Sequence, residues 1–228
     1  MQHPIDYADF LQRFSTKALW HFTGYNKSDN ESLDILVKII KDKVLKISEH
    51  PGEIIMPDGK KRFSFSYSCV CDIPFKDLRI HTERYGKYGI AFEKNKAIIS
   101  GHFNPILYIH KDNFLFKEAY RLLKDIDNFV TPHNELSEKL NKYLNIMGIA
   151  IKRGNLTAPI DMKDKELDKQ QDNNFYYERE WRSAFEWSFQ EQDIEAVMVP
   201  KKDLIAIKES LVGFGSLVVI PYEMVEKL

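Results

Sequence analysis

The stretch from Phe175 to Arg182 gathers several groups capable of chemistry, because it alternates aromatic and charged residues. Alternation with a period of two is typical of a half-buried strand, and on such a strand Glu178, Glu180 and Arg182 share one face. Two carboxylates and a guanidinium on one rigid element could form a catalytic or ligand-binding row. A surface strand with a structural Glu–Arg ladder would show the same pattern.

Arg182 lies next to Glu180 on that face, so it can pair with the carboxylate and keep it ionised. A fixed negative charge lowers the barrier of a reaction in which positive charge develops on the substrate. Glu180 and Glu178 are therefore candidate catalytic residues and Arg182 a candidate ligand-binding residue, with the structural ladder as the alternative.

Three further clusters place polar side chains beside apolar segments. His21 and Thr23 end a short apolar segment, where a histidine is more often a hydrogen-bonded core residue than a functional one. Ser66 belongs to a row of alternating serines, which alone would be the solvent side of an edge strand. Tyr85 and Tyr88 flank glycines and could form a stacking platform for a planar ring, or simply belong to a core strand.

Hydrophobic periodicity predicts the elements that must position these groups. Strands are expected at 18–24, 63–72, 88–92, 105–109, 194–200 and 217–221. Helices are expected at 6–14, 32–44, 75–85 and 202–211, and two helices, broken around 131–133, at 115–143. The segment 146–152 fits either a strand or a buried helix. These elements follow no βαβ rhythm, so we predict one α+β domain over 1–228, with flanking helices on a mixed, largely antiparallel sheet.

Two segments interrupt this pattern, a helical insertion at about 115–145 and a polar loop at 161–174. A polar loop of that length is usually functional or disordered, so we expect it to be mobile and to border a cleft. Polar groups at strand ends in apolar surroundings usually mark a site. We therefore predict that His21, Tyr88 and Glu180 meet in that cleft.

Composition restricts the class of protein. The 228 residues carry a formal net charge of −1, which gives no electrostatic footprint for nucleic acid. Cys69 and Cys71 occupy alternate strand positions and are expected to be reduced thiols of a cytosolic protein. Although Asp72 and His81 are near them in the sequence, the spacing of a structural zinc site is missing, so no metal is predicted. Neither a signal peptide nor an apolar run of ~20 residues is present, which favours a cytoplasmic protein without a membrane segment.

Four motifs occur in an order that resembles the AbiGi family of bacterial abortive-infection proteins. They are Leu19–Thr23, Cys69–Pro74, Tyr85–Phe92 and Tyr177–Arg182. The resemblance implies a role in phage defence. It also implies an operon partner, a nucleotidyltransferase-like toxin, with this chain as the antitoxin.

The order of His21, then Ser66 or Tyr88, then Glu178 and Glu180 is distantly similar to ADP-ribosyltransferases. That similarity implies an ADP-ribosyltransferase-like fold with NAD as cofactor. His21 would hold the nicotinamide ribose, the middle aromatic residue would stack on nicotinamide, and the late glutamate would stabilise an oxocarbenium-like ribose. The similarity implies Glu180, Glu178 and His21 as catalytic residues. The cofactor-binding set would be His21, Thr23, Ser66, Tyr85, Tyr88 and Arg182. The Trp181–Arg182 pair after the glutamates is not part of the enzyme pattern.

Two functions from different classes follow. The first is a defence protein that transfers ADP-ribose from NAD to a macromolecular acceptor, either nucleic acid or protein. The second is a non-enzymatic antitoxin that binds a cognate toxin or a phage protein.

Overall fold

The computed structural model of this protein describes residues 16–48, 52–55, 61–110, 112–114, 117–118, 121, 139, 149–154, 156, 174–215 and 217–227. The predicted helix at 6–14, most of the helical insertion at 115–145, and the polar loop at 161–174 except its last residue lie outside these described residues. Within the described part, no helix is both long enough and apolar enough to cross a membrane.

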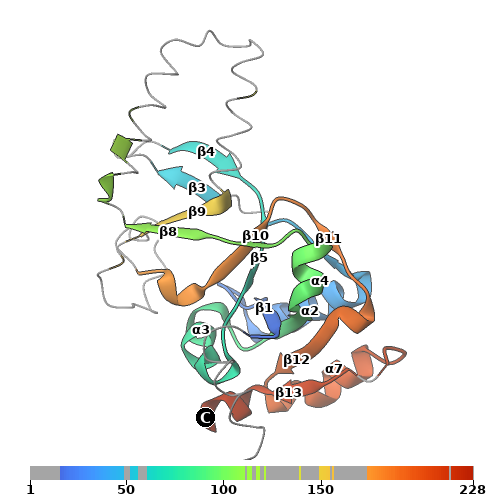
Figure 1. The fold of residues 1–228 in the computed structure, drawn as a ribbon. Coiled ribbons are helices and arrows are strands. Elements are labelled where there is room, and N and C mark those ends of the chain that lie inside the picture. Colours follow the sequence, from blue (N-terminus) through green and yellow to red (C-terminus); the bar gives the residue numbers. More distant parts are fainter. Residues whose placement is uncertain are drawn as a thin grey trace, which may run out of the picture.

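A seven-stranded sheet forms the centre of the fold (Figure 1). In spatial order its strands are β13 (Val219–Pro221), β12 (Ile194–Val199), β6 (Gly89–Glu93), β1 (Ala18–Phe22), β5 (Ser68–Cys71), β10 (Glu180–Ser183) and β7 (Asn104–Pro105). The β12–β13 pair is parallel and the other neighbouring pairs are antiparallel. The predicted α+β class with a mixed, largely antiparallel sheet is confirmed.

Three two-stranded sheets and several helices surround the central sheet. The small sheets pair β2 (Val44–Leu45) with β11 (Trp187–Ser188), β3 (Gly52–Ile55) with β4 (Lys61–Phe65), and β8 (Leu107–His110) with β9 (Ile151–Gly154). The described helices are α2 (Asp29–Asp42), α3 (Leu78–Tyr85), α4 (Lys94–Ile99) and α7 (Leu204–Ser210). Short 3-10 turns are η1 (Phe75–Asp77), η3 (Tyr176–Glu178), η4 (Glu191–Asp193), η5 (Lys201–Asp203) and η6 (Tyr222–Lys227).

Helix α2 has clear local signals at both ends. At its start, the Ser28 side chain accepts a hydrogen bond from the Glu31 backbone N–H at 3.4 Å, and the Glu31 carboxylate accepts one from the Ser28 N–H at 2.8 Å. This reciprocal capping satisfies two backbone donors that the first turn leaves unpaired. Leu36 and Ile40, four residues apart, are fully buried on one side of the helix. The helix ends where Lys43 adopts a left-handed backbone conformation.

The two faces of the central sheet pack against different helices. On one, which we call the α2 face, the core residues are Leu19, Val70, Ile90, Phe92, Val197 and Val199, packed with residues of α2, α4 and α7. On the other, the α3 face, they are Trp20, Cys71, Ala91, Ala196 and Met198, packed with Leu78 of α3 and with Tyr222 and Val225 of η6. Successive strand residues point to opposite faces, which explains why neighbours in sequence divide between the two cores.

Several predicted strands are shorter or divided. The predicted strand at 63–72 separates into β4 and β5. The predicted strand at 105–109 divides because Ile106 donates its N–H to the Glu180 carbonyl at 3.2 Å, after which the chain leaves β10 and pairs with β9. The segment 146–152, for which strand and helix were both open, ends as strand β9. Helix α4 was not predicted, because its six residues present little helical periodicity.

Candidate functional site

The predicted strand over 175–182 is wrong in its first half. Tyr176–Glu178 forms the 3-10 turn η3, Arg179 has a left-handed backbone with φ 43°, and β10 begins only at Glu180. Positive φ is unusual for an arginine, and this left-handed residue separates the turn η3 from strand β10. Glu178 therefore reaches the site from a turn, while Glu180 and Arg182 reach it from a strand.

The predicted pairing of Arg182 with Glu180 is confirmed. The Nε atom of Arg182 donates to Oε1 of Glu180 at 2.8 Å, and its Nη2 atom donates to Oε2 at 3.0 Å. This two-bond geometry is the strongest arrangement for a guanidinium and a carboxylate. Both side chains are buried, with 8% of Glu180 and 5% of Arg182 exposed. Strand register places them opposite Cys71 and Cys69, on the α3 face.

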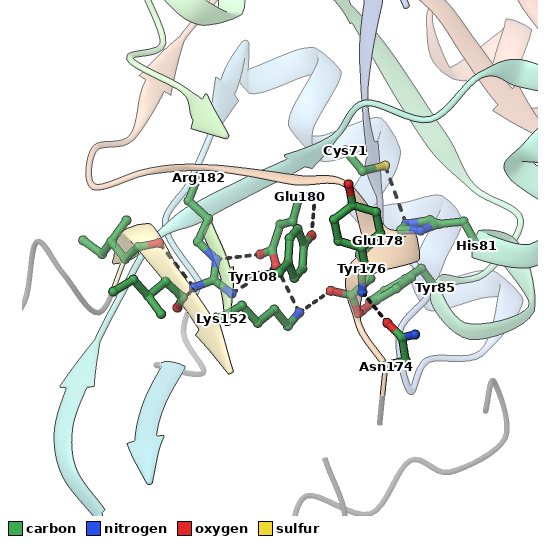
Figure 2. Close-up of polar contacts among 12 residues, drawn as sticks. Cys71, His81, Tyr85, Tyr108, Lys152, Asn174, Tyr176, Glu178, Glu180 and Arg182 are labelled. Carbon is green, nitrogen blue, oxygen red and sulfur yellow. Dashed lines mark hydrogen bonds and ion pairs between the residues drawn. The ribbon is translucent and has the colours of Figure 1, made fainter. Parts of the chain in front are cut away.

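Lys152 from β9 completes the cluster and was not predicted from sequence. Its ammonium contacts Oε2 of Glu178 and lies 3.0 Å from Oε2 of Glu180 (Figure 2). The Tyr85 hydroxyl donates to the remaining Glu178 oxygen, Oε1. All four carboxylate oxygens thus have a protein partner. We call Lys152, Glu178, Glu180 and Arg182 the charge cluster.

Surrounding groups fix the two cations of the charge cluster. The Nη1 atom of Arg182 donates to the carbonyl oxygens of Ile149 at 3.3 Å and Ile151 at 3.5 Å. Its guanidinium also lies 4.2 Å from the centre of the Tyr67 ring. The Lys152 ammonium lies 4.7 Å from the centre of the Phe175 ring. Aromatic faces attract cations most strongly where water is excluded, so these rings help to hold buried charge.

Electrostatic interactions keep Lys152, Glu180 and Arg182 charged at neutral pH. Burial alone would raise the pKa of Glu180, but the charges and hydrogen bonds of Arg182 and Lys152 hold this pKa well below its ordinary value. Burial opposes the positive charge of Lys152 and Arg182, but the neighbouring carboxylates outweigh it and raise the pKa of each. Mutual neutralisation therefore compensates the cost of removing these ions from water.

A histidine and a thiol lie next to the charge cluster. The Nε2 atom of His81 is 3.6 Å from Sγ of Cys71, and its ring stacks on Tyr85 with centroids 4.3 Å apart. Burial, reinforced by the charge of Lys152, lowers the pKa of His81 to about 3, so the imidazole is neutral. Burial raises the pKa of the Cys71 thiol. Among the residues that the structure describes, no three His, Cys, Asp or Glu side chains are grouped to hold a metal ion.

The predicted meeting of His21 with Glu180 is wrong. Trp20 pairs with Cys71, and Cys71 pairs with Glu180, so these three side chains share the α3 face. His21 follows Trp20 in the same strand and therefore lies on the α2 face. Its Nδ1 atom is 2.8 Å from the Cys69 carbonyl oxygen, and burial lowers its pKa.

The other predicted cofactor-binding residues are also dispersed. Tyr85 joins the charge cluster through Glu178, whereas Tyr88 is 1% exposed, belongs to the core on the α2 face and donates its hydroxyl to Asp203 at 2.6 Å. Thr23 is buried and donates its hydroxyl to the Ser32 carbonyl at 2.8 Å. Ser66 lies half-buried in the break between β4 and β5.

Sequence reasoning missed two further polar residues besides Lys152. Tyr108 of β8 accepts the backbone N–H of Glu180 with its hydroxyl at 2.7 Å, and Tyr67 supplies the ring beneath Arg182. The only sequence signal for Lys152 is its position at the end of an apolar run, where a charge must find a partner if the run is buried. Nothing local identifies that partner.

Comparison with known proteins supplies the family. A family model described as abortive phage resistance protein AbiGi, antitoxin, matches residues 35–209. Searches of curated proteins and of solved structures found no match. The ADP-ribosyltransferase-like part of the predicted fold therefore stays a prediction. The family model covers well over half of the chain, and all four residues of the charge cluster fall inside the matched range. The chain belongs to the AbiGi family of abortive phage resistance proteins.

Proposed function

We propose that this chain is the antitoxin of a phage-defence pair and that it binds and neutralises a cognate toxin without catalysing a reaction. Family membership supports the defence setting and the toxin partner. The observation that favours binding over catalysis is the closed charge cluster, in which every carboxylate oxygen of Glu178 and Glu180 has a protein partner.

A glutamate that stabilises an oxocarbenium-like ribose must direct its negative charge at the substrate. The charge of Glu180 is instead directed at Arg182 and Lys152. Two carboxylates face one guanidinium and one ammonium, so the charge cluster as a whole offers no surplus negative charge. This arrangement supports a structural role for the acidic pair.

Cavities support the same conclusion. Two cavities in the described part of the chain, of about 570 and 220 Å³, are lined by other residues than Glu178, Glu180 or Arg182. The smaller one is bordered by His81, Tyr177 and Arg179. Neither provides an opening in which the paired glutamates and a bound NAD would face each other.

The charge cluster instead holds β10 and its flanking turns, which carry exposed aromatic rings. Tyr176, just before the strand, is 66% exposed, and Phe185, just after it, is 61% exposed. Exposed aromatic side chains on a rigid element are typical anchors of protein–protein interfaces. We propose that these two rings contact the toxin.

Co-expression with the toxin tests this proposal. Wild-type chain should restore growth and co-purify with the toxin, and Tyr176→Ala or Phe185→Ala should weaken both effects while the melting temperature is unchanged. Ile205→Ala is the matched control, because Ile205 is 72% exposed but lies on α7. Equal loss in the control, or full neutralisation by both aromatic variants, would reject the proposed contact residues.

The NAD-dependent transferase makes the opposite prediction for Glu180→Gln, which keeps the shape of the side chain and removes its charge. An enzyme that uses this charge should lose about a hundredfold or more in rate, on the order of 3 kcal/mol, with little change in melting temperature. The antitoxin proposal predicts a lower melting temperature, a proportional loss of neutralisation and no NAD turnover by the wild type. Turnover of NAD by wild-type protein that Glu180→Gln abolishes would contradict the antitoxin proposal.

A further inference from the structure

The larger cavity, of about 570 Å³, lies where the start of α2, helix α3 and the turn η6 face one another. Its volume falls in the range of about 300–1,000 Å³ that is typical of small-molecule sites. Three basic residues from three different segments line it, namely Lys27, Arg79 and Lys87. We call this hollow the basic cavity.

Two glycines bring these segments together. A Cβ atom on Gly24 would lie 2.7 Å from the Gly86 Cα atom, and one on Gly86 would lie 2.6 Å from the Gly24 Cα atom. Gly86 also has a φ of 88°, which other residues rarely adopt. Because the two turns touch through their backbones, Lys27, three residues after Gly24, and Lys87, directly after Gly86, line the same hollow.

Positive charge in the basic cavity is not neutralised internally. Within the described part of the chain, none of its three cations forms an ion pair. Of the two acidic residues in the lining, Asp29 is engaged by Lys202 at 2.5 Å, which leaves Glu83. The lining therefore carries a surplus of positive charge, in contrast to the balanced charge cluster.

One of the cations is held in position. The ammonium of Lys87 lies 4.6 Å from the centre of the Tyr222 ring, and this ring is 4% exposed. A buried aromatic face orients an ammonium without neutralising it. The Tyr222 hydroxyl and the Thr82 hydroxyl, 3.4 Å apart, lie in the same lining and add polar groups of fixed position.

We infer that the basic cavity binds a phosphorylated small molecule of nucleotide size. Cations that outnumber the acidic groups around one hollow repel each other, and an anion with several oxygens relieves that repulsion. A phosphate or diphosphate group supplies such oxygens, and the volume leaves space for an attached sugar and base. The inference does not depend on the antitoxin role, because it concerns a different part of the fold.

Isothermal titration calorimetry with ADP, pyrophosphate and adenosine tests this inference on the full chain. ADP and pyrophosphate should bind, adenosine should not, and added salt should weaken ADP binding. Lys87→Glu should weaken ADP binding about tenfold or more, because it replaces attraction by repulsion at one contact. Arg79→Ala should weaken it less. Lys208→Glu is the matched control, since Lys208 is exposed on α7 and outside the cavity.

The named variants change exposed residues and should fold normally, which circular dichroism checks. Adenosine binding as tightly as ADP, equal weakening in Lys208→Glu, or no binding of ADP and pyrophosphate at millimolar concentration would each overturn the inference. Tighter binding of a single-stranded oligonucleotide than of ADP, lost in Lys87→Glu, would also overturn it, because the ligand would then be a polymer.

Discussion

The α2 face of the central sheet and the part of the α3 face near β10 bury their side chains to a similar extent but in different ways. On the α2 face, Leu19, Ile90 and Phe92 are fully buried among apolar neighbours. On the α3 face, near β10, Glu180 and Arg182 are nearly as buried but are held by opposite charge. Burial is therefore a poor guide to what a residue contributes, because the partner decides the consequence of removing it.

The energetic difference follows from solvation. A truncated apolar side chain leaves a cavity, and the free energy of unfolding falls with the atoms removed. A truncated ion leaves its partner charged and buried, which costs about as much as a large cavity although little volume is lost. The comparison can be tested by removing one member of each face and by replacing the ion pair as a unit.

The largest effect is expected for Trp187→Ala at the centre of the α2-face core. Trp187 is 2% exposed, its ring centroid lies 4.9 Å from that of Phe92 and 5.5 Å from that of Phe189, and its indole N–H donates to Ser100 Oγ at 3.0 Å. The free energy of unfolding should fall by about 4 kcal/mol. Urea denaturation measures it, with exposed Ile205→Ala as the control that should change little. A loss below about 1 kcal/mol would mean that the apolar face relaxes around the gap.

The second-largest loss of stability is expected for the single substitution Arg182→Met. It leaves Glu180 buried, with Lys152 shared between two carboxylates. We expect a loss of about 3 kcal/mol in the free energy of unfolding. The double change Glu180→Leu with Arg182→Met removes both charges, leaves the Lys152–Glu178 pair intact, and should recover much of that loss. If the double variant is as unstable as the sum of its single variants, the charges do not act as a unit.

The same contrast explains what the sequence could predict. The buried strands are encoded locally, since the short apolar runs at 88–92 and 194–200 predict strands with buried side chains without knowledge of the partner strand. The period of two also predicts that Glu180 and Arg182 lie on the same face, because both belong to one strand. In the charge cluster, however, Lys152 is separated from Glu178 by 26 residues and from Glu180 by 28. Spacing within one element cannot reveal such a partner.

Errors in the site arose from the same limit. The sequence groups His21 with Glu180 because each is expected at a strand end in apolar surroundings, but alternation in β1 places His21 on the opposite face. The register between two strands decides which of their residues share a face of the sheet, and one sequence does not specify that register. Tyr85 is predicted from the sequence only as a stacking or cofactor-binding residue, whereas in the folded protein its hydroxyl donates to Glu178.

A third, smaller effect is the acid sensitivity of the charge cluster. Because the folded protein lowers the pKa of Glu180 below its unfolded value near 4.5, the stabilisation is fully present above that pH and is lost as the pH falls. Between pH 4.5 and 3 only part of this stabilisation is lost. The free energy of unfolding should therefore fall by less than it does in Arg182→Met. Glu180→Gln, whose amide does not titrate, should show a flatter stability curve in this range. Parallel curves for the two proteins would contradict the lowered pKa.

The smallest effect is expected for Tyr88→Phe, which removes one polar atom from the apolar face. The ring of Tyr88 is 1% exposed and packs in the α2-face core, and its hydroxyl donates to Oδ2 of Asp203 at 2.6 Å. Phenylalanine keeps the ring, and Asp203 is partly exposed, so water can replace the lost donor. The free energy of unfolding should fall by about 1 kcal/mol, the net value of an ordinary hydrogen bond. Tyr176→Phe, on a ring 66% exposed, is the matched control. A loss as large as that of Arg182→Met would show that Asp203 depends on Tyr88 as Glu180 depends on its cations, and the two faces would then share one mode of stabilisation.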